Sequence, residues 1–352
     1  MLQARLNLHL IFILSHFLLA KSNPLAPALY IFGDSLVDNN GNNNWLPTMA
    51  RANYAPYGLN FPGPDLLGRF TNGRTIADFM AEYLGLPYPP PYASLFGLNN
   101  PGLLDPIPNA PQFKPGSMGG YNYASAACGI LPETGIDLGK CYTFDQQIEM
   151  FKQTVQSQLF PTFKDETQEI LSKSIFLVCV GTNDYLNNYF MPFSPFSQQY
   201  DPPHFAQLLI HRLSLQLKRL YNLGARKVMV MEVGPLGCTH APQQELPFLL
   251  SYLTSTLPGS RFVLLHTYSF SYDAITNPWK YGLSDNSNSC CKTWLNGGLQ
   301  CIPKQTPCPN PNEHFFWDGY HPTEAAYSRF SREVIYGSSG SSPINLMQLV
   351  EL

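Results

Sequence analysis

The stretch ALYIFGDS, residues 28–35, decides the fold of this chain. An unbroken apolar run leads into Gly33, and the polar residues Asp34 and Ser35 follow it directly. Continuous apolar runs, unlike alternating ones, are typical of parallel strands that are covered on both faces. The stretch therefore predicts a buried strand with a lone serine at its end, which can cap a helix, hold a phosphate or attack a carbonyl carbon.

Three further apolar runs have the same character, and helical patterns lie between the runs. The additional runs span Ser174–Asp184, Lys227–Gly237 and Arg261–Phe270. The helical patterns span Phe144–Gln158, His204–Asn222 and Thr323–Ile335. Strands that alternate with helices predict an α/β fold with a mostly parallel sheet and right-handed crossovers.

Residues Trp45–Pro115 differ from this pattern because they are dense in Pro, Gly and Asn and hold few long periodic elements. We interpret this region as an extended surface excursion and not as a separate domain. The chain of 352 residues then forms a single domain over residues 23–352, behind a signal peptide over residues 1–22.

The signal peptide is predicted from a short basic lead at Arg5, an apolar run from Leu6 to Ala20, and small residues near Ala20 and Ser22. A membrane anchor is the alternative, but the run is shorter than the roughly 20 apolar residues that a bilayer span needs. No other stretch approaches that length. We therefore expect a secreted, soluble protein without stable membrane insertion.

The composition limits the choice of partners. The chain has 21 basic and 24 acidic side chains, a formal net charge of −3, and 44% hydrophobic residues. It has no basic stripe, so we do not expect nucleic acid as a partner. Only 13% of the residues are charged, which predicts a surface of aromatic and proline-rich loops.

Eight cysteines in a secreted chain predict disulfides. Cys128 and Cys141 bracket a short loop, and a bridge between them would stabilise the fold by roughly 3 kcal/mol. Cys179 lies within an apolar run and is interpreted as a buried free thiol.

Four other cysteines crowd one loop rich in Pro and Gly. Cys290 and Cys291 are adjacent, so each is expected to pair with either Cys301 or Cys308, which leaves two possible connectivities and leaves Cys238 without a partner. A zinc site is the alternative, but the spacing lacks a C-x-x-C pair, so we expect no metal.

Polar residues follow three of the predicted strands at their carboxyl ends. Ser35 follows the first strand, Asn183 and Asp184 follow the second, and Gly234–Cys238 follow the third. Ligands bind beyond the carboxyl ends of the strands in open parallel sheets. These positions are therefore the first candidates for a functional site.

Another candidate lies in HFFWDGYHPTEAAYSRF, residues 314–330. A short turn between Asp318 and His321 can set a carboxylate against one imidazole nitrogen and leave the other free, as a general base requires. Each motif alone is more often structural, with Ser35 or Asn183 as a cap or turn residue. The ordered combination on an α/β scaffold favours catalysis, with the Asn183 amide as a donor to an oxyanion.

Four segments resemble the conserved blocks of the plant GDSL esterase/lipase family, within the SGNH hydrolases: FGDSLVD, NYASAACGI, VGTNDY and FFWDGYHPTEAA. The resemblance runs from about Tyr30 to the C-terminus. It implies a flavodoxin-like three-layer α/β/α fold and the hydrolysis of carboxylic esters, such as acyl lipids, in the cell wall or apoplast. It implies neither a metal nor a cofactor, and it admits cell-wall polymers as partners beside a small-molecule or lipid ester substrate.

Carried over by position, the resemblance makes Ser35 the nucleophile, His321 the base and Asp318 the acid that orients the base. Asn183 and the backbone N–H of Ser35 would donate to the oxyanion. The third donor usually comes from a glycine, where this chain has Ala126. The backbone N–H of an alanine can serve there if its φ is ordinary, whereas a positive φ would be unfavourable.

The chain departs from the family pattern at two places. Relatives have a longer stretch after GPLGC, with a helix and a Cys-Glu pair that would partner Cys238, and only Thr239–Leu257 remains here. We therefore expect a domain shortened between 239 and 257, with one face of the sheet uncovered. His266 also stands where relatives usually have an aspartate.

The leading hypothesis is a secreted serine esterase or lipase that forms an acyl-enzyme on Ser35. One alternative is a catalytically silent cell-wall binding or structural protein, which the shortened segment favours. Another is an acyltransferase that passes the same acyl group to an alcohol. A nucleotide-binding role ranks last, because GDSLVDNNG lacks the glycine spacing and the lysine of a phosphate loop.

Overall fold

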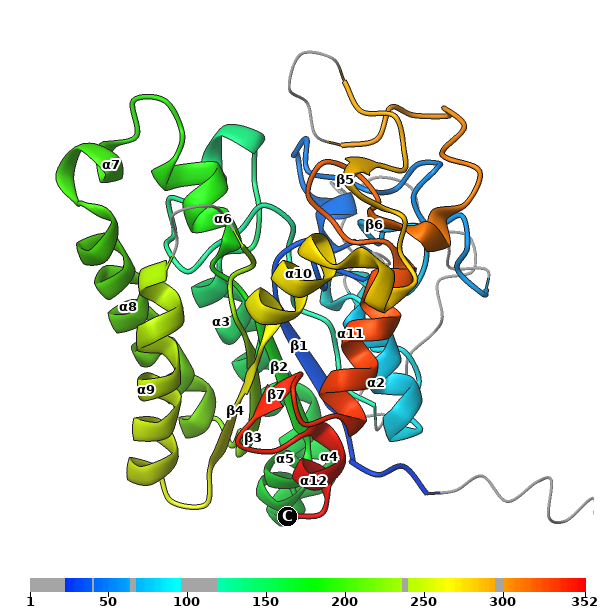
Figure 1. The fold of residues 1–352 in the computed structure, drawn as a ribbon. Coiled ribbons are helices and arrows are strands. Elements are labelled where there is room, and N and C mark those ends of the chain that lie inside the picture. The colour runs from blue at the N-terminus through cyan, green and yellow to red at the C-terminus, as the bar shows by residue number, and fades with distance from the viewer. Residues whose placement is uncertain (1–22, 40, 64–67, 96–118, 236–239, 295–299) are drawn as a thin grey trace, which may run out of the picture.

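The computed structural model describes residues 23–39, 41–63, 68–95, 119–235, 240–294 and 300–352. Its centre is a five-stranded sheet in the order β1-β2-β3-β4-β7 (Figure 1). The first four strands pair in parallel, and β7 pairs with β4 in the antiparallel direction. The strand bounds are β1 Leu29–Gly33, β2 Ile175–Cys179, β3 Lys227–Met231, β4 Arg261–Leu265 and β7 Ser341–Ser342.

Helices cover both faces of this sheet (Figure 1). Side chains alternate along the strands, so Phe32 belongs to a core cluster with residues of α3, α8 and α9, and Ile31 belongs to a second cluster with residues of α2, α11 and α12. These layers confirm the predicted α/β/α fold with a mostly parallel sheet. The helix bounds are α2 Ile76–Leu84, α3 Phe144–Thr154, α4 Phe160–Phe163, α5 Thr167–Lys173, α6 Thr182–Asp184, α7 Pro195–Gln199, α8 Pro202–Asn222, α9 His240–Thr256, α10 Thr267–Thr276, α11 Glu324–Tyr336 and α12 Leu346–Val350.

The segment 119–125 lies beside β1 as a further parallel partner. The N–H groups of Leu29 and Ile31 donate to the carbonyl oxygens of Gly119 and Tyr121. A side chain at Gly120 would place its Cβ 2.1 Å from the carbonyl oxygen of Leu29, so this close approach requires glycine. The contact brings the block NYASAACGI alongside the strand that leads to the candidate nucleophile.

All four predicted strands are confirmed. Each predicted apolar run extends a few residues beyond the strand that forms. The three predicted helices are confirmed as α3, α8 and α11. The first continues past Thr154 into a π-helical turn, Val155–Leu159. The last begins after Thr323, whose hydroxyl accepts a hydrogen bond from the N–H of Ala326.

The helix α9 lies in the segment that was expected to leave the sheet uncovered. It packs against α8 and β4, so the expectation of an uncovered face is wrong over this helix. Its buried leucines recur at helical spacing and join the core cluster on this face. Pro247 inside the helix obscured the pattern. The predicted unpaired Cys238 lies outside the described residues. The buried leucines are Leu246, Leu249, Leu250 and Leu253.

The region 45–115 is less peripheral than its composition predicts. It contains α2, whose Ile76 and Met80 are buried and which packs against α11. Tyr57 and Phe70 are buried as well. The prediction of a surface excursion is therefore wrong for this part of the region, because a few apolar side chains between its turns reach the core.

The described residues contain three disulfides. The bridge across the short loop is the predicted one, and the cysteine-rich loop adopts one of the two predicted connectivities. Cys179 is a buried free thiol, as predicted. The cysteine-rich loop joins β5, Asp285–Ser289, to β6, His314–Phe316, and these two strands form a separate two-stranded sheet. The disulfides are Cys128–Cys141, Cys290–Cys308 and Cys291–Cys301.

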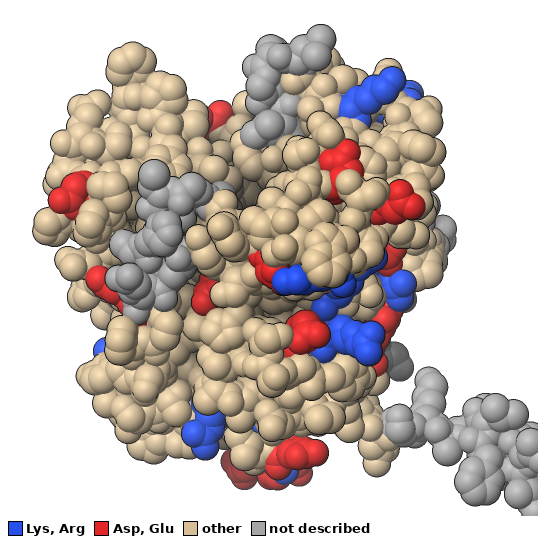
Figure 2. Space-filling model, in the orientation of Figure 1, with Lys and Arg blue, Asp and Glu red and all other residues tan. Residues whose placement is uncertain are grey.

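The visible surface carries few charges. Figure 2 shows a face that consists mostly of uncharged residues, with acidic and basic side chains scattered over it. In the described ranges, no helix is both long and apolar enough to cross a membrane. The same ranges hold no group of three or more His, Cys, Asp or Glu side chains arranged to hold a metal ion.

Candidate active site

The carboxyl end of β1 is fixed by α3 and β2. The N–H of Gly33 donates to Oε1 of Gln147 at 2.8 Å, and its carbonyl oxygen accepts from Nε2 of the same side chain at 2.9 Å. The φ angle of Gly33 is 145°, and a Cβ at this position would lie 2.0 Å from the carbonyl oxygen of Cys179. Only glycine allows this approach. The chain can therefore turn out of the sheet here and present Ser35.

Ser35, His321 and Asp318 meet at this point. Nε2 of His321 lies 2.8 Å from Oγ of Ser35. Nδ1 of the same imidazole lies 2.9 Å from each carboxylate oxygen of Asp318. An imidazole held in this way can take a proton from the hydroxyl while the carboxylate stabilises the imidazolium.

The Asp318 side chain is fully buried and is held by several donors. Its Oδ1 accepts the backbone N–H groups of Tyr320 and His321 at 2.9 and 2.8 Å. Its Oδ2 accepts the hydroxyl of Tyr57 at 2.6 Å. These bonds satisfy the lone pairs of a carboxylate that has been removed from water, so the short Asp-x-x-His turn is rigid.

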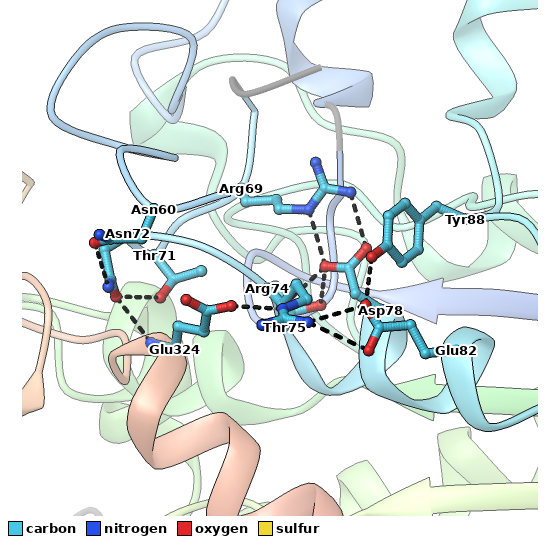
Figure 3. Close-up of polar contacts among 10 residues, drawn as sticks. All are labelled: Asn60, Arg69, Thr71, Asn72, Arg74, Thr75, Asp78, Glu82, Tyr88 and Glu324. Carbon is cyan, nitrogen blue, oxygen red and sulfur yellow. Dashed lines mark hydrogen bonds and ion pairs between the residues drawn. The ribbon is translucent and has the colours of Figure 1, made fainter. Parts of the chain in front are cut away.

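A buried ion pair anchors the segment 69–74 beside the site (Figure 3). Arg69 and Asp78 both have 0% exposed side chains, and two bonds of 2.8 and 2.9 Å join them. Asp78 also accepts the N–H of Thr75 at 2.9 Å, as part of the capping box of α2. Paired bonds of this kind orient both groups, so the chain has a fixed course where it enters α2.

The same segment holds the loop that carries the imidazole. Oγ1 of Thr71 donates to the carbonyl oxygen of Pro322 at 2.8 Å. Oδ1 of Asn72 accepts the N–H of Glu324 at 2.8 Å, at the first residue of α11 (Figure 3). The loop before α11 is therefore fastened to a part of the chain about 250 residues earlier.

Two aromatic residues next to the triad were not singled out from the sequence. Tyr57 donates to Asp318, and the ring of Phe70 lies 5.0 Å from the imidazole of His321, measured between centroids. Both lie in the region 45–115, where Pro and Gly dominate the local pattern. The only sequence signal for them is the presence of large aromatic residues in a stretch that otherwise resembles a loop.

Asn183 lines the same cleft as Ser35. Its Nδ2 donates to the carbonyl oxygen of Cys128 at 2.9 Å, and its Oδ1 accepts from Nδ2 of Asn187 at 2.6 Å. The second proton of the Asn183 amide has no acceptor among the described residues. An amide that is held at both ends and keeps one free proton can donate to charge that develops beside Ser35.

Ala126 also lines the cleft, near the buried carboxyl group of Asp38. Burial raises the pKa of Asp38 to about 7, and backbone N–H groups that include the one of Ala126 lower it. Ala126 is not among the described residues with a positive φ, whereas its neighbour Ala127 has a φ of 69°. The condition of an ordinary φ is therefore met at Ala126, and the role of Ala126 in an oxyanion hole stays a prediction.

Asp184 fixes the loop 129–134, which begins at the end of the block NYASAACGI. Its carboxylate accepts the N–H groups of Ile130 and Leu131 at 2.7 and 2.9 Å and the hydroxyl of Thr134 at 2.7 Å. Burial raises the pKa of Asp184 to about 6, although these three donors lower it. The second polar residue of the predicted Asn-Asp pair thus positions a loop.

The run of asparagines after the first strand joins β1 to the second block. Nδ2 of Asn42 donates to the carbonyl oxygens of Asn122 and Ala124 at 2.9 and 2.7 Å. Nδ2 of Asn43 donates to the carbonyl oxygen of Ala126 at 3.0 Å. Neither asparagine was predicted from the sequence as a positioning residue, although their clustering directly after the GDS motif was a signal.

Asp34 is fully buried beside the triad. Its Oδ1 accepts the N–H of Leu36 at 3.0 Å, and its Oδ2 has no hydrogen-bond partner among the described residues. Burial raises the pKa of Asp34 to about 7, and the N–H of Leu36 and the nearby His321 lower it. Through its bond to the N–H of Leu36, Asp34 shapes the turn that contains Ser35.

A cleft of about 550 Å³ opens beside the triad. Its size is in the range of small-molecule sites, which are typically lined by apolar side chains with a few convergent polar groups. Trp294 and Tyr320 line the cleft and are 51% and 38% exposed. The cleft can therefore hold an apolar chain next to the hydroxyl of Ser35. Its apolar lining includes Met49, Leu138, Leu186, Ile275, Phe315 and Phe316.

The chain is similar to known proteins over most of its length. The family model described as GDSL-like Lipase/Acylhydrolase matches residues 29–334. GDSL esterase/lipase 7 of Arabidopsis thaliana is 41% identical, over 94% of this chain and 93% of the relative. GDSL esterase/lipase At1g33811 of the same plant is 39% identical, over 93% of this chain and 91% of the relative. The first alignment spans 362 positions, more than the 352 residues of this chain, so part of that relative has no counterpart here.

Proposed function

The chain belongs to the GDSL-like lipase/acylhydrolase family, and from this premise we propose that it hydrolyses carboxylic esters through an acyl-enzyme on Ser35. Its family and its relatives, which are named GDSL esterase/lipases, make it an ester hydrolase. The observation that carries the mechanism is the continuous hydrogen-bonded series from Ser35 through His321 to Asp318.

In the first step, Oγ of Ser35 attacks the ester carbonyl carbon and gives its proton to Nε2 of His321. Asp318 stabilises the imidazolium that forms and keeps the other ring nitrogen as a donor. The tetrahedral intermediate then expels the alcohol, which takes the proton from the imidazolium. A water molecule, activated by the same imidazole, attacks the acyl-enzyme and releases the carboxylic acid.

Negative charge develops on the carbonyl oxygen of the ester during the attack, and fixed hydrogen-bond donors beside Ser35 can stabilise it. The Asn183 amide is held by Cys128 and Asn187 and keeps one proton available. We assign it as an oxyanion donor together with the backbone N–H of Ser35. Donors that are already oriented lower the barrier because they need no reorganisation during the reaction. The backbone N–H of Ala126, which lines the same cleft, is the third candidate.

The substrate class follows from the lining of the cleft. Aliphatic and aromatic side chains dominate this lining. The described lining residues include no Lys or Arg that would bind an acidic head group. We therefore assign an ester with an apolar acyl group, such as an acyl lipid. Three disulfides and the predicted signal peptide support secretion to the cell wall or apoplast. We also propose cell-wall polymers as further partners, because a protein secreted to this compartment would meet them.

A fluorophosphonate probe and a panel of p-nitrophenyl esters with increasing acyl length test this function together. We expect the probe to modify Ser35, as identified by mass spectrometry of the labelled peptide, and we expect hydrolysis of the esters. Folded protein that is neither labelled nor active would instead support the silent cell-wall protein. Transfer of the acyl group to an added alcohol in preference to water would identify an acyltransferase.

A further inference from the structure

We propose that Tyr57 is a positioning residue of the Ser35–His321–Asp318 site, whose hydroxyl fixes the Asp318 carboxylate and sets the charge that the imidazole meets. This inference rests on the function proposed above and adds a fourth residue to its machinery. Tyr57 does not touch the reacting atoms and acts through Asp318.

The hydrogen bonds of the Tyr57 hydroxyl have a fixed direction. Its oxygen lies 2.6 Å from Oδ2 of Asp318, and the backbone N–H of Cys301 points to the same oxygen at 3.1 Å. A backbone N–H can only donate, so the phenol oxygen accepts from Cys301 and gives its own proton to Asp318. Tyr57 is 1% exposed and Asp318 is 0% exposed, so water does not replace either partner.

The phenol keeps its proton over the working range of such an enzyme. Burial, together with the adjacent charge of Asp318, raises the pKa of Tyr57 well above its usual value. A neutral phenol that donates to a carboxylate forms a charge-assisted bond, which is stronger than a bond between neutral groups. The pKa of Tyr57 therefore agrees with the role that the geometry gives to it.

Oδ2 of Asp318 depends on this bond. The two backbone N–H groups of the turn both donate to Oδ1. Oδ2 accepts from Tyr57 and lies 2.9 Å from Nδ1 of His321. Without the phenol hydroxyl, Oδ2 would keep only the imidazole as a partner in a buried site. More negative charge would then face His321, which favours the imidazolium over the neutral base.

The surroundings hold Tyr57 in place for this task. Cys301, which donates to its hydroxyl, is fixed by the disulfide to Cys291 and by a hydrogen bond of 2.9 Å from the Tyr54 hydroxyl to its carbonyl oxygen. The ring of Phe70 contacts Tyr57 on one side and His321 on the other, with centroid distances of 5.8 and 5.0 Å. The phenol is therefore part of a packed layer that spans the triad and the cysteine-rich loop.

The Tyr57→Phe variant tests the inference, with Tyr123→Phe as the matched control. Tyr123 is also fully buried, and its hydroxyl also donates a hydrogen bond, at 2.8 Å to Thr154. Its ring contacts are with other aromatic residues outside the triad. The measurements are kcat, KM and the pH profile of kcat/KM on a p-nitrophenyl ester, with thermal unfolding of each variant.

For Tyr57→Phe we expect kcat to fall about tenfold and KM to stay within about twofold, because the Asp318 carboxylate then loses a donor that fixes its orientation towards the imidazole. We also expect the acid limb of kcat/KM, where the base must lose its proton, to move up by about half a pH unit. Tyr123→Phe should lower the unfolding temperature and leave the acid limb in place. An unmoved acid limb with wild-type kcat in Tyr57→Phe would overturn the inference.

A second substitution keeps the test decisive if Tyr57→Phe does not fold. Incorporation of 3-fluorotyrosine at position 57 makes the phenol a stronger donor with little change in its volume, so the acid limb should move to lower pH. A limb that stays in place or moves upward overturns the role of Tyr57 alone. If the wild-type protein neither hydrolyses esters nor reacts at Ser35 with the fluorophosphonate, the proposed function itself fails and this inference fails with it.

Discussion

Nε2 of His321 lies 2.8 Å from Oγ of Ser35, although 286 positions separate the two residues along the chain. If Ser35 and His321 act as one catalytic unit, removal of either residue should lose the same stabilisation of the transition state. We expect Ser35→Ala and His321→Ala each to lower kcat by about 10⁴–10⁶-fold, and the double variant to be no slower than the worse single variant. Steady-state kinetics on a p-nitrophenyl ester measure this, with circular dichroism as the control for folding. Additive losses would show that the two residues act independently.

Asp318→Asn should preserve the shape of the site and lose most of the rate. An amide in this position can hold the imidazole in the wrong tautomer and cannot stabilise the imidazolium, so we expect kcat to fall by about 10⁴-fold. Labelling of Ser35 by the fluorophosphonate should slow in parallel. A variant with more than about a tenth of the wild-type rate would contradict the role assigned to Asp318.

Asn183→Ala should act on the transition state and leave substrate binding largely intact. We expect kcat to fall by about 10²–10³-fold with KM little changed, because the donor meets charge that develops only during the reaction. The measurement is the split between kcat and KM over a range of substrate concentrations. A rise in KM at constant kcat would instead assign Asn183 to ground-state binding.

The buried carboxyl groups predict a fold that loses stability as the pH rises towards neutrality. Burial raises the pKa of Asp34 and Asp38 to about 7 and that of Asp184 to about 6, from an ordinary value of 3.8. The folded state therefore binds more protons than the unfolded state between about pH 4 and 7, and the free energy of unfolding falls as the pH rises through this window.

Asp38→Asn isolates one of these contributions. The variant should show a shallower decline of the unfolding free energy between about pH 4 and 7 than the wild type, as measured by denaturant titration at several pH values. The exposed Asp165, changed to Asn, is the control and should leave the slope unchanged. Parallel curves for wild type and Asp38→Asn would refute the predicted effect of burial on this group.

The disulfide Cys291–Cys301 should support both stability and rate. It closes a loop with a sequence separation of 10, so its replacement by two serines should lower the free energy of unfolding by about 2–3 kcal/mol. Because the N–H of Cys301 holds the Tyr57 hydroxyl, kcat should fall as well. Replacement of the neighbouring Cys290–Cys308 pair is the comparison and should affect stability more than kcat. Equal loss of kcat in both double variants would argue against a specific route through Tyr57.

The parts of the fold that could be predicted from the sequence are those with a strong local signal. Unbroken apolar runs mark strands that are buried on both faces, and β1 to β4 lie where those runs predicted them. The proximity of Ser35 to His321 was an expectation from the family resemblance, since no local pattern relates two residues so far apart. Their roles in catalysis stay predictions until they are measured.

The parts that could not be predicted depend on partners distant in sequence. The helix α9 contains Pro247, which lowers helical propensity, yet packing of its leucines against α8 and β4 stabilises it. The pairing in the cysteine-rich loop was left with two solutions, because spacing alone does not state which sulfur atoms approach each other. Tyr57 was missed for the same reason, since its importance comes only from the carboxylate 261 positions further along.

The loop before α11 brings the imidazole of His321 to the hydroxyl of Ser35, which lies near the start of the described part of the chain. A nascent polypeptide that has emerged from the ribosome only as far as β4 contains Ser35, Asn183 and most of the sheet, but it lacks His321, the proposed base. The same holds for any product truncated before residue 321. On the proposed mechanism, we therefore expect ester hydrolysis only once translation is nearly complete.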